Sequence, residues 1–167
     1  HHRDQRGAGE DGDPPLAAEE EVVADAPLVI AETRVDIPTA SVYDYLFERI
    51  SDAELDTVAL IDAKSGRQTT YREMVARIDS FAGALAARGV GVGDVVGLLA
   101  PNSSAFAVSF HGILRAGATA TTINALFTAK DIAKQLTDSK AKMLITVTPL
   151  LAQAKEGATL AGLSPDN

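Results

Sequence analysis

The sequence predicts an α/β fold in which a mostly parallel sheet is flanked by helices and preceded by a β-hairpin. Three short apolar runs begin near residues 95, 118 and 142, as the strands of a covered sheet do. A helical pattern separates each run from the next, and such alternation builds parallel sheets with right-handed crossovers. Because only three such strands are present, we expect a doubly wound sheet that is incomplete within this chain.

The composition is that of one globular domain with a tail. The chain has 167 residues, 46% of them hydrophobic, and a mean hydropathy of +0.06, which suffices for a sizeable core. No apolar run approaches the roughly 20 residues that cross a bilayer. No signal peptide is recognisable, so we expect a cytoplasmic protein without a membrane span. The absence of cysteine excludes disulfides and thiolate metal sites.

The net charge of −8 is concentrated near the N-terminus. Residues 1–37 carry ten acidic and three basic side chains, whereas residues 38–167 carry thirteen and twelve. A nearly neutral body lacks the basic patch that binds phosphate backbones, so we expect no nucleic-acid partner. We interpret residues 1–26 as a tag remnant and a flexible acidic leader, with an interaction tail as the alternative. Residues 27–167 are expected to form the α/β part.

The first element predicted in the α/β part is a helix. Thr39 or Ser41 can cap it, and it would run to about Asp52. One side of this helix would carry an apolar stripe that contains Val42, Tyr45, Leu46 and Ile50. Tyr43 and Tyr45 are interpreted as half-buried packing residues rather than site residues.

A hairpin and a long helix follow. Residues 58–62 and 67–70 have the pattern of short strands, joined by a turn in which Gly66 supplies the positive φ. Thr70 and Glu73 form a capping box, which predicts the start of the helix. Its buried positions would be Tyr71, Val75, Ile78, Ala82 and Leu85. Its solvated face would carry Arg72, Arg77, Asp79 and Arg88.

Glycines 89, 91 and 93, followed by Asp94, invite a dinucleotide-binding interpretation, since glycine-rich turns let the backbone approach a pyrophosphate. That fingerprint follows a strand and opens a helix. These glycines instead end a helix and lead into the apolar strand at residues 95–100. We therefore interpret the run as a helix C-cap, with Gly89 at C′, and a turn into a strand.

The next helix is predicted at residues 105–114, capped by Asn102 or Ser103 and buried on most sides because nearly every residue in it is apolar. His111 lies within this run and is interpreted as a satisfied core histidine rather than a catalytic base. The free N–H groups near Ser103 and Ser104 could hold an anion, but every helix start has that ability.

Two more strand–helix units complete the predicted sheet. A strand at residues 118–124 precedes a helix opened by the Thr128 and Asp131 capping box. A strand at residues 143–147 precedes a helix that begins with Thr148 at N-cap and Pro149 at N1.

Several segments carry a family resemblance with matching order and spacing: residues 69–74, 89–96, 99–103, 111–118, 122–124, 131–136 and 139–142. Together they resemble the N-terminal portion of acyl-CoA ligases of the adenylate-forming superfamily. The similarity covers about residues 36–160. It is greatest to the branch that contains 4-coumarate:CoA ligases, fatty-acyl-CoA synthetases and luciferase-like enzymes.

The resemblance implies a two-step reaction of the parent protein. A carboxylic acid attacks ATP in the presence of Mg²⁺ to give an acyl-adenylate and pyrophosphate, and the thiol of coenzyme A then displaces AMP. It also implies that the family's phosphate-binding loop, its adenine, ribose and acyl sites, and its C-terminal lysine lie beyond residue 167. We therefore expect no catalytic, cofactor-binding or metal-binding residue in this chain, and we expect the fragment alone to be inactive and to bind no cofactor.

The positions that match the family have scaffold roles in this interpretation. Asn102 and Ser103 would cap the apolar helix, Gly117 would close it, and Asn124 would end a strand where its side chain could brace a loop.

Three hypotheses remain. In the favoured one, the chain is an inactive N-terminal fragment whose partner is the remainder of its own polypeptide. The second treats it as a stand-alone α/β nucleotide- or ligand-binding domain, and the third as a protein-interaction module. The fragment hypothesis predicts an exposed sheet edge and apolar helix faces, and hence self-association.

Overall fold

The computed structural model describes residues 37–164, so the expectations for residues 1–26 lie outside the described part of the chain. Its elements in chain order are α1 (Val42–Phe47), α2 (Asp52–Leu55), β1 (Val58–Ile61), β2 (Gln68–Thr70), α3 (Tyr71–Ala87), β3 (Val95–Leu99), α4 (Ser104–Arg115), β4 (Thr119–Ile123), α5 (Ala129–Ser139), β5 (Met143–Thr146), the 3₁₀ turn η1 (Thr148–Leu150) and α6 (Leu151–Leu160). No described helix is long and apolar enough to cross a membrane.

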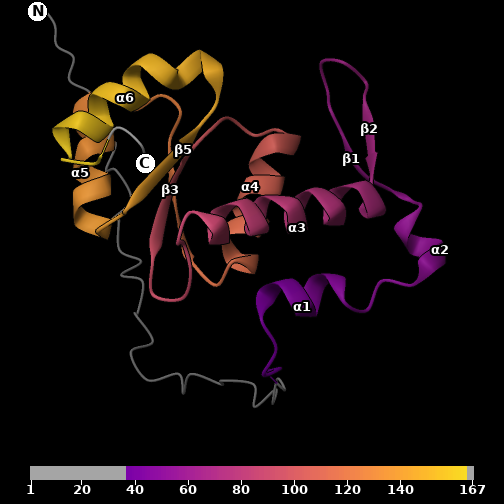
Figure 1. Ribbon diagram of the computed structural model, residues 1–167. Helices are drawn as coiled ribbons and strands as arrows, with labels where there is room; N and C mark the ends of the chain where they lie inside the picture. The colour runs from indigo at the N-terminus through magenta and orange to yellow at the C-terminus, as the bar shows by residue number, and fades with distance from the viewer. Residues whose placement is uncertain (1–36, 165–167) are drawn as a thin grey trace, which may run out of the picture. The chain divides into compact units, whose positions relative to one another are not determined.

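The predicted hairpin is confirmed. Strands β1 and β2 pair antiparallel, with Ile61 opposite Gln68. Gly66 has a φ of +69° in the turn, where Asp62 Oδ1 accepts bonds from the Ser65 N–H and hydroxyl at 2.8 and 2.7 Å. Figure 1 shows this hairpin beyond the N-terminal end of α3, apart from the three-stranded sheet.

The main sheet is parallel, as the sequence predicts, and has the strand order β4-β3-β5. Strand β3 lies at its centre, with Val96 opposite both Ala120 on β4 and Met143 on β5. The chain therefore passes from β3 to one neighbour through α4, and then crosses β3 through α5 to reach the other. Right-handed crossovers in opposite directions place the two connecting helices on opposite faces of the sheet.

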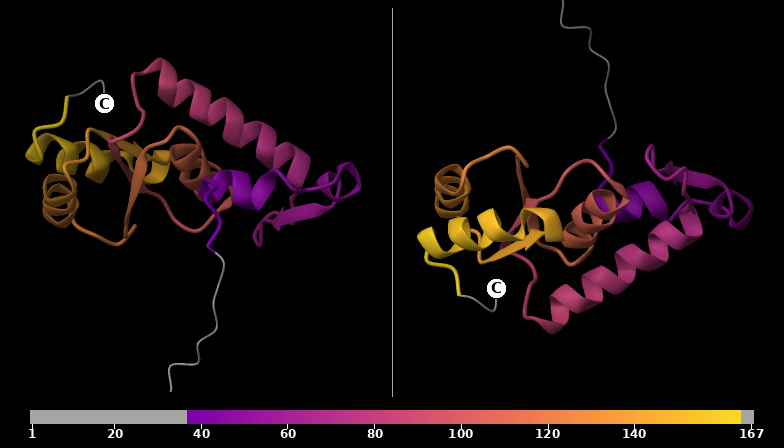
Figure 2. Two further views of the ribbon diagram at one scale, coloured as in Figure 1. Left: turned by 90° about the horizontal axis from the view of Figure 1, so that it is seen from below. Right: turned by 90° about the horizontal axis from the view of Figure 1, so that it is seen from above.

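Helices cover both faces of the sheet (Figure 2). On one face Val96 and Leu98 of β3 pack with Leu85 of α3 and Ile113 of α4. On the other face Leu99 packs with residues of α5 and α6, among them Ile132, Leu136 and Ala154. Side chains of a strand point alternately to opposite faces, so β3 contributes to both layers. The predicted doubly wound α/β class is confirmed.

Helix α3 starts at the predicted capping box, in which the Thr70 hydroxyl accepts from Glu73 N and the Glu73 carboxylate accepts from Thr70 N. Its buried stripe differs by one position from the prediction near the start. Met74 is buried, whereas Tyr71 and Val75 are half-buried. The residues at positions 74, 78, 82 and 85 are buried because this side of α3 packs against α4. The most apolar side of the first turn does not decide which residues are buried.

The single helix predicted to run to Asp52 is two helices. Helix α1 ends at Phe47, and Ser51 starts α2 with a capping box of its own with Glu54. The predicted orientation of α1 is also wrong: Tyr45 and Leu46 are 53% and 46% exposed, while Tyr43 is 5% exposed. Tyr43 packs with Met74 and Ile78 of α3, and Phe47 lies against His111 of α4. These contacts decide which side of the short helix faces inward.

Two further expectations are wrong. Helix α4 was expected to be buried on most sides, but only Gly112 and Ile113 in it are fully buried. Ala105 is exposed and the other apolar side chains of α4 are half-buried, because the described residues cover one side of the helix. At the last helix, Thr148 is not an N-cap: it begins η1, Val147 precedes that turn, and no side chain caps α6.

Candidate functional site

The place where this fold type puts a ligand is the carboxyl edge of the sheet, at the point where the strand order reverses. Here that point lies between β3 and β5, since α4 and α6 leave these strands on opposite faces. Thr146 Oγ1 donates to the Leu99 carbonyl oxygen at 2.9 Å, which joins the two strand ends. The edge is thus fixed in position by the chain itself.

The segment after β3 carries the predicted cap. Ser103, rather than Asn102, is the N-cap of α4, and its hydroxyl accepts from Phe106 N at 3.2 Å. Gly117 closes the same helix with a φ of +80°, and a Cβ there would lie 2.9 Å from Cγ2 of Val92. Ser103 therefore caps α4 and Gly117 closes it, as the sequence predicts for these two residues.

The loop after β4 is braced from two sides. Asn124 Oδ1 accepts from Leu126 N at 2.9 Å, which confirms the predicted bracing role of Asn124. Gln153 on α6 donates from Nε2 to the Phe127 carbonyl oxygen at 2.8 Å. Sequence reasoning missed Gln153, because a polar residue on a helix gives no signal about a loop 26 residues earlier.

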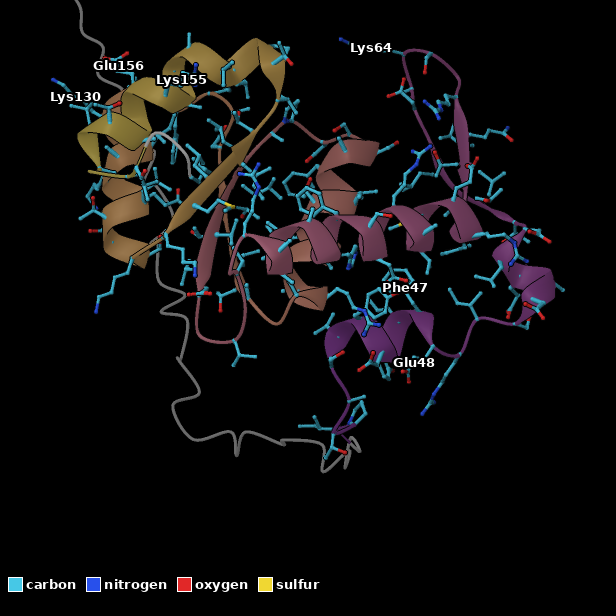
Figure 3. All side chains as sticks on the ribbon, in the orientation of Figure 1. Phe47, Glu48, Lys64, Lys130, Lys155 and Glu156 are labelled. Atoms are coloured by element: carbon cyan, nitrogen blue, oxygen red, sulfur yellow. The ribbon has the colours of Figure 1, made fainter. Side chains whose placement is uncertain are left out.

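His111 differs from its predicted state. Its Nδ1 is buried and has no hydrogen-bond partner among the described residues, so it is not a satisfied core histidine. The ring lies between those of Phe47 and Phe110, at centroid distances of 5.2 and 5.4 Å. Figure 3 shows Phe47 pointing from α1 towards the helices that it packs against. Burial lowers the pKa of His111, which keeps the imidazole neutral.

The glycine run is a turn, as predicted. Gly89 has a φ of +75° after the end of α3, and Gly93 has a φ of +89° before β3. Asp94 Oδ2 accepts from Gly91 N at 2.8 Å and from Lys142 Nζ at 2.7 Å. The Lys142 ammonium, and then the Gly91 amide, lower the pKa of Asp94. The polar groups of this turn therefore bond to one another and to β5, at the amino edge of the sheet.

The described residues do not supply a donor set for a divalent cation. Among residues 37–164, no group of three or more His, Asp or Glu side chains could hold a metal ion. The donors near the carboxyl edge are hydroxyls and amides that already cap a helix, join two strands or brace a loop. This arrangement can position neighbouring segments, but we assign it no chemical step and no cofactor ligand.

Comparison with known proteins places the chain in a family. The sequence profile of the family described as AMP-binding enzyme matches residues 47–165. A 4-coumarate–CoA ligase of Arabidopsis thaliana is 42% identical over 106 residues, which are 62% of this chain and 19% of that protein. The chain thus spans about a fifth of the length of this relative.

Solved structures agree with the sequence comparison. A benzoate CoA ligase from Burkholderia xenovorans has a TM-score of 0.68 and 31% identity, and the match covers 75% of this chain and 25% of that one. The N-terminal domain of FACL13 from Mycobacterium tuberculosis has a TM-score of 0.61 and 28% identity, over 68% of this chain and 29% of that one. The chain belongs to the AMP-binding enzyme family and has the fold found in the N-terminal domains of adenylate-forming acyl-CoA ligases.

Proposed function

We propose that this chain is the first α/β part of an ATP-dependent, AMP-forming ligase that joins a carboxylic acid to coenzyme A. The observation that carries the proposal is the family match over residues 47–165, together with 42% identity to a 4-coumarate–CoA ligase. In this reaction a carboxylate oxygen attacks the α-phosphorus of ATP and pyrophosphate leaves. The sulfur of coenzyme A then attacks the acyl carbon, and AMP leaves with the electron pair of the broken bond.

The role proposed for the described residues is to support the catalytic portion of the whole protein. ATP, Mg²⁺ and coenzyme A would be bound by that portion, and the 167-residue chain alone would be inactive and bind none of them. A cytoplasmic location is part of the same proposal. The bonds of Ser103, Asn124 and Gln153 would hold the loops at the carboxyl edge of the sheet in fixed positions.

The partner proposed for the open surfaces is the remainder of the same polypeptide. Each outer strand of the main sheet pairs only with β3 among the described residues, and unpaired strand edges invite further strands. Beside β5, a groove of about 320 Å³ is lined by Leu144, Leu151 and Ala154. Ile61 on the hairpin is 65% exposed. A two-stranded hairpin is marginally stable alone, which also favours a further partner.

The test is a carboxylate-dependent exchange of labelled pyrophosphate into ATP, followed by detection of the coenzyme A thioester. The product of the complete reading frame would be assayed with aromatic and fatty carboxylic acids, with the 167-residue chain at equal concentration as the control. We expect Mg²⁺-dependent exchange with the whole protein and none with the control. A whole protein that activates no carboxylate would contradict the proposed reaction, and exchange by the shorter chain would contradict the supporting role.

A further inference from the structure

A groove with one cationic end runs between α3 and α4 to the β1–β2 hairpin. It consists of two hollows of about 630 and 270 Å³. Both are lined by Arg67, Arg77, Ser104 and Ala105, so the hollows adjoin at the two arginines. The larger hollow has the size of a small-molecule site.

Neither arginine is neutralised within the described part of the chain. Arg67 is exposed on the hairpin and Arg77 is half-buried on α3. Two other described arginines are paired, Arg72 with Asp56 at 2.7 Å and Arg115 with Asp79 at 3.3 Å. Arg49 and Arg88, like Arg67 and Arg77, have no ion pair among the described residues. Residues 37–164 provide no hydrogen bond or ion pair to the guanidinium group of Arg67 or Arg77. Planar guanidinium groups bind carboxylates and phosphates through paired N–H···O bonds.

Two other polar side chains at this end, those of Asp62 and Ser103, already make hydrogen bonds within the chain. Asp62 also lines the smaller hollow, but its Oδ1 accepts bonds from Lys64 N and from the Ser65 N–H and hydroxyl at 3.2, 2.8 and 2.7 Å. Ser103 caps α4 with its own hydroxyl. This end of the groove is lined by two guanidinium groups and the one carboxylate of Asp62, so its net positive charge comes from the two arginines and not from the start of α4.

Away from the arginines the groove is mainly apolar, with Ser80 and Ser109 as its polar residues. Phe81 and Ala84 of α3 face Ala105 and Val108 of α4 along its length. Helices α3 and α4 approach closely here, since a Cβ on Gly112 would lie 2.6 Å from Cδ1 of Phe81. An occupant must therefore combine one anionic group with an apolar chain.

We propose that this groove binds an amphiphilic carboxylate, a small molecule with one carboxylate group and an unbranched apolar chain. The carboxylate of the ligand lies between Arg67 and Arg77, and its apolar chain lies between α3 and α4 along Phe81 and Val108. The inference uses only the groove and its charges, so it does not depend on the ligase reaction proposed above.

The experiment is calorimetric titration of the 167-residue chain with dodecanoate below its micelle concentration. We expect saturable binding that Arg67→Gln and Arg77→Gln each weaken about tenfold, the value of one charge-assisted hydrogen bond. Arg88→Gln is the matched control, because it removes the same charge from α3 away from the groove. Acetate lacks the apolar chain of the ligand, and dodecyltrimethylammonium carries a positive charge in place of the carboxylate. Neither compound should bind as tightly as dodecanoate.

A second pair of variants tests the apolar part without touching an arginine. Ala84 and Ala87 are both exposed on α3, but only Ala84 lines the groove. Ala84→Glu therefore places a carboxylate in the groove, and Ala87→Glu places one outside it. We expect only Ala84→Glu to weaken binding. The proposal is overturned by the absence of saturable binding, by equal effects of Arg88→Gln and Arg77→Gln, or by acetate binding as tightly as dodecanoate.

Discussion

Tyr43 on α1 donates a hydrogen bond from its hydroxyl to Asp79 Oδ1 on α3, at 3.0 Å. Arg115 on α4 joins the same cluster: its Nε lies 3.3 Å from Asp79 Oδ1, and its guanidinium carbon lies 4.4 Å from the centre of the Tyr43 ring. Three helices therefore meet at these side chains. Asp79 is exposed, as expected for the solvated face of α3, but its carboxylate also binds Tyr43 of α1 and so holds α1 against the body of the domain.

Removing the Tyr43 hydroxyl should weaken folding and change its pH dependence. Burial, and then the bond to Asp79, raise the pKa of Tyr43 to about 12, whereas an unfolded tyrosine ionises near pH 10. The folded chain thus holds the proton more tightly, so this stability is complete below pH 10 and is lost as the pH rises towards 12. Tyr43→Phe should lower the free energy of unfolding at pH 8 by about 1 kcal/mol and flatten the decline above pH 10.

Urea unfolding of Tyr43→Phe at several pH values checks this expectation. Tyr45→Phe is the matched control, because it removes the same hydroxyl from a 53% exposed tyrosine on the same helix. An equal loss of stability in both variants would show that the Asp79 bond contributes nothing specific.

Gly157 on α6 should be essential for the packing of α6 on α5. A Cβ at this position would lie 2.6 Å from Cγ2 and 2.8 Å from Cβ of Ile132, atoms that cannot swing aside. Gly157→Ala should therefore lower the free energy of unfolding by about 1–3 kcal/mol. Gly83→Ala on α3, where a Cβ would meet nothing within 4 Å, should raise it by about 0.5–1 kcal/mol. Thermal unfolding of both variants tests these expectations. A Gly157→Ala protein as stable as the original chain would contradict the close contact with Ile132.

Local signals predicted much of this fold because their geometry is fixed by spacing along the chain. The capping boxes of Thr70 with Glu73 and of Thr128 with Asp131 are both present in the structure. The positive φ of Gly66 and Gly89 is present as well. In each case the interacting groups lie within a few residues, so tertiary packing has little opportunity to overrule the sequence pattern.

Features that depend on distant contacts could not be predicted in the same way. The six-residue helix α1 has apolar residues on more than one side, and contacts with α3 and α4 select Tyr43 over Tyr45. The bond from Gln153 on α6 to the loop at Phe127 joins residues 26 positions apart and leaves no local pattern. The candidate groove has the same origin, since Arg67 and Arg77 come together only when the hairpin folds beside α3.

Lys140 offers a route to a more stable chain. It follows the last residue of α5 with a φ of +55° and a ψ of +38°, and it is the only described residue other than glycine with a positive φ. A side chain in this region is strained, so Lys140→Gly should raise the free energy of unfolding by about 0.5–1 kcal/mol. Lys155→Gly within α6 makes the same replacement in helical backbone and should lower it by about 1 kcal/mol. Chemical denaturation of both variants provides the comparison, and destabilisation by Lys140→Gly would contradict the strain.

His111 should make the folded chain sensitive to mild acid. Its ring is half-buried and contacts Phe47 and Phe110, its buried Nδ1 is unpaired among the described residues, and burial holds its pKa below the ordinary value of 6.5. The unfolded chain therefore takes up a proton near pH 6.5 that the folded chain resists. The stability is complete above this pH and declines as the pH falls towards the lower folded-state pKa.

Replacing the imidazole with a ring of similar shape should remove this sensitivity. His111→Phe should unfold at the same or a slightly higher urea concentration than the original chain at pH 8, since an unpaired buried nitrogen costs about 1 kcal/mol or more. The advantage should grow between pH 7 and pH 5, where only the original chain must keep its histidine neutral to fold. Parallel stability curves for the two proteins over this range would mean that the folded chain accommodates both protonation states of His111 equally well, which would contradict the prediction.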